Sequence, residues 1–277
     1  MDLGFDDVHV LVTGIPCASG IELVKLFLDL GAQVTGQYNT NAEPLTTLAA
    51  SHPKPKNLLS VQASLTSEDS IASLYATASE HFKKPVAVLV INHAKVHPPV
   101  ALVDMDLGRW EDTIKQDLTS PFLVTRKFLG GLRTAQGGPE GDRARDKVSV
   151  VFVGSTAGLF GEAFRADYAA AKSAVMYGLP LSLKNEIVKI APRGRVKCVA
   201  PGWTKTPRVA GSLQDPNLVG RALATMPLNK VAEPKDIAYQ VAILASSVVS
   251  GHVTGQLVVV AGGMEGRLLS NPGNMTI

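Results

Sequence analysis

Tyr168 and Lys172 have the residue types and the spacing that acid–base chemistry needs. They lie in the alanine-rich run Ala166–Val175, which predicts a helix because alanine is the strongest helix former. Residues four apart lie on one face of a helix, one turn from each other. An ammonium group beside a phenol stabilises the phenolate and lowers the phenol pKa below its usual value of about 10. The pair therefore predicts a side chain that exchanges a proton with a substrate oxygen.

Ser155 adds a hydroxyl group to the same candidate site. It follows the apolar run Val148–Gly154, which predicts a buried strand. A hydroxyl group at the carboxyl end of such a strand can hydrogen-bond the oxygen with which Tyr168 would exchange a proton.

Ser155, then Tyr168-x-x-x-Lys172, then Pro201-Gly202-Trp203 resemble the catalytic core of the short-chain dehydrogenase/reductases. The resemblance covers the chain from about Val8 to Met264, and it is nearest to fungal, single-domain reductases of the acyl-carrier-protein-reductase type. It implies that Tyr168 is the acid/base, that Lys172 holds the cofactor ribose and tunes Tyr168, and that Ser155 orients the carbonyl. It also implies a homo-oligomer, either a dimer or a tetramer.

The composition favours one α/β domain that spans residues 1–277. Hydrophobic residues make up 45% of the chain, which allows a sizeable core. A net charge of +3 without any Lys/Arg run argues against a nucleic-acid partner. No apolar run approaches the roughly 18 residues of a membrane span. Two distant cysteines, with no metal-ligand spacing, and an acidic N-terminus lead us to expect a cytoplasmic protein without a metal site.

Seven strand patterns alternate with helix patterns, which predicts a doubly wound parallel seven-stranded sheet of the Rossmann type. The family resemblance adds the strand order 3-2-1-4-5-6-7. A polar surface loop is expected over residues 136–143. The predicted strands cover residues 8–14, 32–38, 58–63, 86–91, 148–154, 195–200 and 257–260, and the predicted helices include 67–82, 107–133 and 234–246.

The turn after the first strand predicts a dinucleotide site, because a helix N-terminus binds a pyrophosphate. The family pattern Thr-Gly-x-x-x-Gly-x-Gly is matched at Gly14 and Gly20, but Ala18 replaces the middle glycine. A methyl group there reduces the room for the pyrophosphate. Cys17 beside it is either a reactive thiol at a helix N-terminus or an ordinary packing residue.

The second strand ends in Tyr38-Asn39-Thr40-Asn41, without the acidic residue that would bind the ribose of NAD. This favours NADP over NAD, although no arginine is evident to hold the 2′-phosphate. Three further family positions differ, because Ser64, Ala94 and Ala261 stand where Asp, Gly and Asp are usual. The predicted cofactor-binding residues are Gly14, Ser19, Gly20, Ile21, Asn39, Ser64, Asn92, Lys172 and Thr206.

Several other polar residues near the candidate site allow two interpretations each. The family places a fourth catalytic residue, an Asn that holds a water leading to the lysine, where this chain has Asp117. Asp117 either does this with an added negative charge near Lys172, or is solvated and without a role. His93 is interpreted as a turn histidine with a satisfied backbone bond rather than as a catalytic base. Arg165 and Asp167 either bind a polar substrate or are solvated rim residues.

The first functional prediction is an NADP-dependent oxidoreductase that reduces a carbonyl group, or oxidises an alcohol, of a small secondary-metabolite substrate. The alternative is a non-redox cyclase, isomerase or dehydratase of a fungal biosynthetic pathway, in which cofactor binding is weakened or lost. The alternative is motivated by five departures from the family pattern at positions that serve the cofactor or the proton relay. A non-catalytic regulator ranks last, because it needs no Ser, Tyr and Lys together. The five departures are Ala18, Ser64, Ala94, Asp117 and Ala261.

Overall fold

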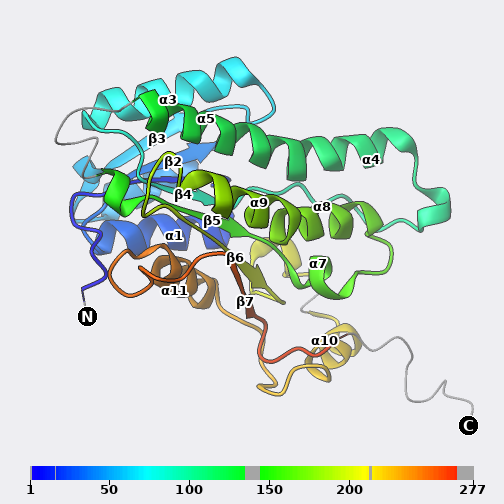
Figure 1. Ribbon diagram of the computed structural model, residues 1–277. Coiled ribbons are helices and arrows are strands. Elements are labelled where there is room, and N and C mark those ends of the chain that lie inside the picture. Colours follow the sequence, from blue (N-terminus) through cyan, green and yellow to red (C-terminus); the bar gives the residue numbers. More distant parts are fainter. Residues whose placement is uncertain (1, 16, 135–143, 212–213, 267–277) are drawn as a thin grey trace, which may run out of the picture.

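The computed structural model describes residues 2–15, 17–134, 144–211 and 214–266. Within them the chain forms one parallel sheet of seven strands in the order β3-β2-β1-β4-β5-β6-β7 (Figure 1). This confirms the predicted doubly wound fold and strand order. The predicted loop over 136–143 lies outside the described residues. The strands are β1 (His9–Val12), β2 (Gln33–Tyr38), β3 (Leu58–Gln62), β4 (Val88–Ile91), β5 (Ser149–Val153), β6 (Arg195–Pro201) and β7 (Gln256–Val260).

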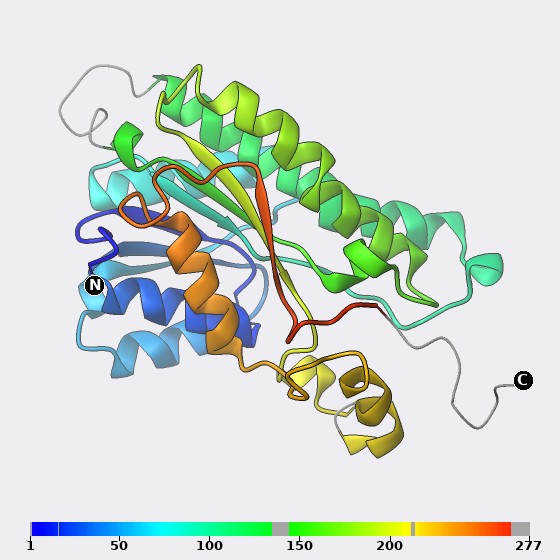
Figure 2. The same cartoon turned by 60° about the horizontal axis from the view of Figure 1, so that its bottom comes forward.

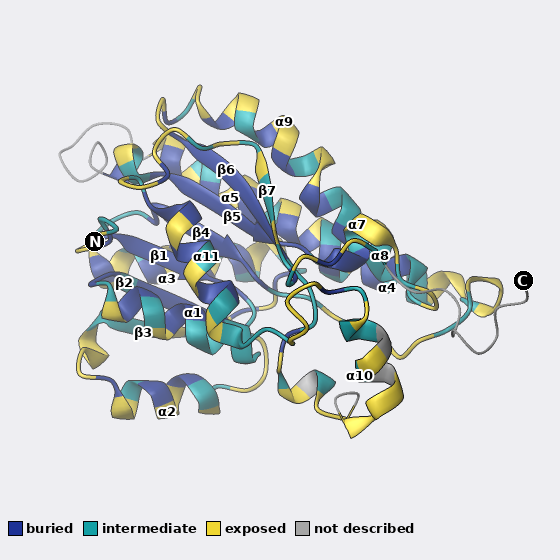
Figure 3. Ribbon diagram, turned by 90° about the horizontal axis from the view of Figure 1, so that it is seen from below, coloured by how far each residue is buried: buried dark blue, intermediate teal, exposed yellow. Residues whose placement is uncertain are grey.

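Helices cover both faces of the sheet, because successive strand residues point to opposite sides. Val10 and Val12 of β1 pack on one face with α1, α2 and α11, whereas Leu11 packs on the other with α3, α5, α8 and α9. Figure 3 shows the strands buried between these two layers. The helices are α1 (Ala18–Asp29), α2 (Glu43–Ser51), α3 (Glu68–Phe82), α4 (Leu107–Ile114), α5 (Ser120–Thr134), α7 (Thr156–Phe160), α8 (Ala166–Met176), α9 (Gly178–Ile187), α10 (Pro216–Leu223) and α11 (Pro234–Ala245).

The helix predicted over 107–133 is interrupted in its middle. Between α4 and α5 the chain makes a π-helical turn, η3 (Lys115–Thr119), so the prediction of one regular helix is wrong at this point. A π turn inserts one extra residue and is frequently found at functional sites. Here it contains Asp117, one of the predicted catalytic residues.

The segment after β6 leaves the sheet and forms η4 (Pro207–Val209) and α10, with α10 standing apart from the two helix layers (Figure 2). A further short helix, η2 (Leu102–Asp104), precedes α4. In the described part of the chain, no helix combines the length and the apolar character that crossing a membrane would require.

Candidate active site

Ser155 lies where β5 ends and α7 begins. Its backbone is extended, with φ −165° and ψ 149°, and its Oγ accepts a hydrogen bond from the N–H of Ala157 at 3.1 Å. Ser155 is therefore the N-cap of α7, as serine commonly is. Because its hydroxyl accepts this bond, the hydroxyl proton is left to donate to a substrate oxygen.

Gly158 brings α7 against α8. A Cβ atom at Gly158 would lie 2.7 Å from the backbone carbon of Lys172 and from the backbone nitrogen of Ser173. Real Cβ atoms do not approach backbone atoms this closely, so only glycine permits the contact. The packing thus brings the helix that follows Ser155 onto the helix that carries Tyr168 and Lys172.

Lys172 is 3% exposed, and its Nζ donates to the carbonyl oxygen of Val153 at 3.1 Å. The same Nζ lies 5.7 Å from the centroid of the Tyr168 ring. Tyr168 itself is partly exposed. Ser155, Tyr168 and Lys172 therefore meet at the carboxyl end of β5, and the arrangement can donate a proton and a hydrogen bond to one substrate oxygen.

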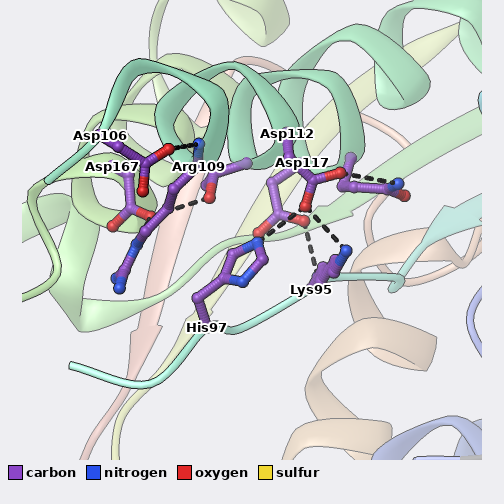
Figure 4. Close-up of polar contacts among 9 residues, drawn as sticks. Lys95, His97, Asp106, Arg109, Asp112, Asp117 and Asp167 are labelled. Atoms are coloured by element: carbon purple, nitrogen blue, oxygen red, sulfur yellow. Dashed lines mark hydrogen bonds and ion pairs between the residues drawn. The ribbon is translucent and has the colours of Figure 1, made fainter. Parts of the chain in front are cut away.

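Asp117 is fully buried in the π turn. Its Oδ1 accepts the backbone N–H of Lys95 at 2.7 Å, so it anchors the segment that follows β4 (Figure 4). Because Asp117 is buried, its interpretation as a solvated residue is wrong. A buried carboxylate needs contacts such as this hydrogen bond to compensate for the loss of water. Its role beside Lys172 stays a prediction.

His93 bridges two hydroxyl groups. Its Nδ1 lies 2.8 Å from Oγ1 of Thr13 and its Nε2 lies 2.7 Å from Oγ of Ser120. Burial and, to a smaller extent, the positive charge of Lys172 together lower the pKa of His93 to about 3. The ring is therefore neutral at pH 7 and occupied by side-chain hydroxyls rather than by the backbone bond that we expected.

Asn92 fastens the end of β4 to the turn after β1. Its Nδ2 lies 3.2 Å from the carbonyl oxygen of Thr13 and 3.2 Å from Sγ of Cys17. The same Sγ accepts the N–H of Gly20 at 3.3 Å, which makes Cys17 the N-cap of α1. A Cβ atom at Gly20 would meet the Asn92 amide at 3.1 Å. This environment favours the packing interpretation of Cys17.

The N-terminus of α1 suits a dinucleotide diphosphate. Its first turn contains no acidic residue, and the first N–H groups of a helix, here those of Ala18 and Ser19, have no partner within the helix. The N–H of Ile21, by contrast, has a backbone partner, because it donates to the carbonyl oxygen of Cys17. The residues present therefore fit the nicotinamide dinucleotide that the family resemblance implies, even with Ala18.

Gly14 supports this turn through its conformation. Its φ is +77°, which favours glycine, and its N–H donates to Oε1 of Gln37 at 2.9 Å. Gln37 also donates from Nε2 to the carbonyl oxygen of Ala63 at 2.7 Å, so it joins the ends of β1, β2 and β3. Sequence reasoning missed Gln37, because a polar residue within a strand pattern carries no signal of its partners.

The other predicted cofactor residues lie beyond the carboxyl ends of their strands. Asn39 is exposed after β2, and its carbonyl oxygen accepts from Nε2 of Gln62 at 2.8 Å. Ser64 is exposed after β3, with its Oγ 3.2 Å from Oγ1 of Thr66. Thr206 is partly exposed before η4. Carboxyl ends of parallel strands share one edge of the sheet, which is where α/β proteins bind ligands.

Asp167 does not face a substrate. It is 1% exposed, and its Oδ2 accepts from Nε of Arg109 at 3.0 Å and from Oγ1 of Thr113 at 2.8 Å (Figure 4). Burial acts to raise the pKa of Asp167, but the bonds from Arg109 and Thr113 outweigh it and lower that pKa. Both sequence interpretations of Asp167, as a substrate ligand and as a solvated rim residue, are therefore wrong.

A polar stripe on α4 and the π turn could have revealed this network. Residues spaced by three and four share one helix face, and on this helix such a face is wholly polar. A polar face turned toward the protein needs partners from other elements. The stripe consists of Arg109, Asp112, Thr113, Gln116 and Asp117.

Among the residues that the structure describes, no group of three or more His, Cys, Asp or Glu side chains could hold a metal ion.

The sequence of the chain is similar to those of known reductases and dehydrogenases. Residues 18–265 match the family described as enoyl-(acyl carrier protein) reductase. The chain is 30% identical to the cis-4-hydroxycyclohexanecarboxylate dehydrogenase of Sinomonas cyclohexanicum over 265 residues, 95% of this chain and 98% of that one. It is 29% identical to the 3-oxoacyl-(acyl-carrier-protein) reductase of Vibrio cholerae over 257 residues, 92% and 96% of the two chains.

A solved structure from Brucella melitensis, titled as a short-chain dehydrogenase/reductase of the glucose/ribitol dehydrogenase kind, has the same fold. It superposes with a TM-score of 0.82 at 26% identity and covers 95% of this chain and 99% of its own. By sequence and by fold, the chain belongs to the short-chain dehydrogenase/reductase family.

Proposed function

We propose that the protein is an NADP-dependent oxidoreductase that reduces a carbonyl group, or oxidises the corresponding alcohol, of a small secondary-metabolite substrate. The observation that carries the proposal is the convergence of Ser155, Tyr168 and Lys172 at the carboxyl end of β5. The names of the relatives, which are dehydrogenases and reductases, support the same reaction type.

Each residue of the proposed site has a separate task. The cofactor supplies or accepts the hydride when bound, and the protein aligns it. Tyr168 gives a proton to the substrate oxygen in reduction, and removes it in oxidation. Lys172, held by the carbonyl of Val153, keeps a positive charge beside the Tyr168 ring and is available to the ribose. Ser155 donates a hydrogen bond that orients the carbonyl group.

The preference for NADP is supported by the end of β2. Tyr38, Asn39, Thr40 and Asn41 put no carboxylate there, so a 2′-phosphate meets no repulsion. The free thiols of Cys17 and Cys198 support a reducing, cytoplasmic setting. Exposed apolar side chains on α5 and α9, such as Phe122 and Leu181, support a homo-oligomer.

The first experiment is a calorimetric titration with NADPH, NADP⁺ and NADH, followed by a screen of carbonyl compounds for NADPH oxidation. We expect micromolar binding of the phosphorylated cofactors and weaker binding of NADH. Tyr168→Phe should abolish turnover while cofactor still binds, and Tyr177→Phe, at an exposed tyrosine, serves as the matched control. Substrate conversion without NADPH oxidation would replace this proposal by the non-redox cyclase, isomerase or dehydratase.

A further inference from the structure

One carboxylate oxygen of Asp112 contacts two basic side chains. Nζ of Lys95 lies 2.7 Å and Nε2 of His97 lies 2.8 Å from its Oδ2 (Figure 4). Gln116, one turn further along the helix, donates to Oδ1 at 3.5 Å. The hydrogen bond from Lys95, with a smaller contribution from that of His97, outweighs the effect of burial and lowers the pKa of Asp112, so its carboxylate is ionised at neutral pH.

The segment that carries Lys95 and His97 lies beside the loop that leads to Tyr168. We call residues 93–103 the rim segment and residues 159–167 the substrate loop. Nη1 of Arg165 donates to the carbonyl oxygen of His97 at 2.6 Å, and the N–H of Val100 donates to the carbonyl oxygen of Phe164 at 2.9 Å. The charges held by Asp112 are therefore at the edge of the proposed substrate site.

The basic side chains of both segments already have partners. Both segments lie entirely within the described residues. Lys95 and His97 meet Asp112, and Nε of Arg165 lies 3.5 Å from Oε1 of Glu162. His93 is neutral and occupied by Thr13 and Ser120. An anionic substrate that approached along these segments would have to compete with carboxylates for each cation.

Apolar side chains are exposed on the same two segments. Phe164 is 59% exposed, and it takes a φ of +66°, which is strained for a bulky residue. Leu102 and Val103 are 67% and 90% exposed. Neighbouring exposed apolar side chains favour contact with an apolar ligand or partner. The rim segment and the substrate loop therefore present a ligand with exposed apolar side chains and with charged side chains that already have partners.

We propose that Asp112 sets the charge preference of the substrate site: by neutralising Lys95 and hydrogen-bonding His97, it makes the site select an uncharged, apolar carbonyl compound over one that carries a carboxylate. The inference rests on the proposed carbonyl reductase function, and it makes Asp112 a specificity-determining residue that acts through the rim segment rather than by touching the reacting atoms.

The test compares two ketones of nearly equal shape, neutral 4-acetylbenzamide and anionic 4-acetylbenzoate. Their dissociation constants are measured by calorimetry with NADP⁺ present, so that no hydride can be transferred. The native protein should bind the amide at least about tenfold tighter than the acid. Asp112→Asn should reduce this ratio by about fivefold, because it leaves Lys95 without a counter-charge, and 0.5 M NaCl should reverse most of the change.

Glu111→Gln is the matched control, because Glu111 is exposed on the same helix and the substitution removes the same charge. It should leave the ratio unchanged. An equal change in both variants, no change in Asp112→Asn, or preference of the native protein for the acid would overturn the proposal, as would failure of the amide to bind at 10 mM. If the amide binds but NADPH never reduces it, the proposed function fails, whereas the binding ratio still decides the charge preference.

Discussion

Nζ of Lys172 lies 5.7 Å from the centre of the Tyr168 ring while it donates to the carbonyl oxygen of Val153 at 3.1 Å. A cation within about 6 Å of an aromatic ring is attracted by it. The Val153 carbonyl therefore holds the ammonium group at the end of β5, and the Tyr168 ring lies along the same face of α8. One backbone carbonyl thus determines where the positive charge of the proposed site lies.

Lys172→Met should lower turnover by at least about 100-fold, because the charge beside Tyr168 is lost. The linear apolar side chain fits a buried position, so we expect the thermal midpoint to change little. Cofactor affinity should fall as well, whereas Tyr168→Phe should keep it. Steady-state kinetics with calorimetric titration of NADPH measures both. Unchanged cofactor affinity in Lys172→Met would contradict a ribose-binding role for this lysine.

Gly158→Ala should destabilise the protein and impair turnover, because the new methyl group would meet the α8 backbone at 2.7 Å. Overpacking of this kind costs about 1–3 kcal/mol. Gly178→Ala is the matched control, because nothing lies within 4 Å of its Cβ position. That variant should be neutral or slightly stabilising. Chemical denaturation of both variants checks the difference, and equal effects would contradict the close packing of α7 on α8.

The sheet and the Tyr168 helix could be predicted because their signals are local. Buried parallel strands are continuous apolar runs, so residues 148–154 predicted β5 to within one residue at each end. The polar stripe that contains Asp117 indicates that this face needs partners, but it identifies neither the π turn nor the partner, which is the backbone of Lys95, 22 residues away. The pairing of Asp167 with Arg109 joins residues 58 apart. Charged side chains are mostly exposed in proteins, which is why sequence reasoning misjudged Asp167.

Asp117→Ala should destabilise the protein by about 1–3 kcal/mol, because the backbone N–H of Lys95 loses the acceptor of a partly buried hydrogen bond. Asp117→Asn keeps an oxygen in reach of this N–H and removes a buried charge, so it should cost less than half as much. Urea denaturation of the two variants measures the difference. If both substitutions destabilise equally, the charge of Asp117 rather than its hydrogen bond to Lys95 holds this part of the fold.

Acid should destabilise the protein through two histidines that are neutral in the native state. Burial lowers the pKa of His9 from 6.5 to about 4, and that of His93 from 6.5 to about 3. Between these values and 6.5 the unfolded chain binds more protons, so stability is lost as the pH falls through this window. His9 alone contributes on the order of 3 kcal/mol.

Thermal unfolding of the native protein and of His9→Gln, measured from pH 7 to pH 4, tests this. His9→Gln should lose less stability over the range, although it is less stable at pH 7 because the ring contacts Thr35 and the Lys84 carbonyl. His252→Gln, at an exposed histidine, should follow the native curve. Parallel curves for His9→Gln and the native protein would show that His9 is not the titrating group.

Lys197 should make the protein more stable as the pH rises from about 6. It is fully buried in β6, and burial, aided by the charge of Arg195, lowers its pKa from 10.5 to about 6. Its Nζ donates to the carbonyl oxygen of Leu244 at 2.5 Å. Between pH 6 and pH 10.5 the unfolded lysine is protonated and the native one is neutral. The unfolded state therefore binds more protons, and the free energy of unfolding increases with pH across this range.

Lys197→Met should remove this dependence and leave the protein at least as stable at pH 7. At pH 7 the lysine has to lose its proton on folding, whereas methionine has no proton to lose, and this gain outweighs the donor that the carbonyl of Leu244 loses. Denaturation curves at pH 7, 8 and 9 measure the slope. Lys189→Met, at an exposed lysine, should keep the native slope. A slope unchanged in Lys197→Met would mean that this lysine stays protonated within the fold, held by Leu244 and Ser149.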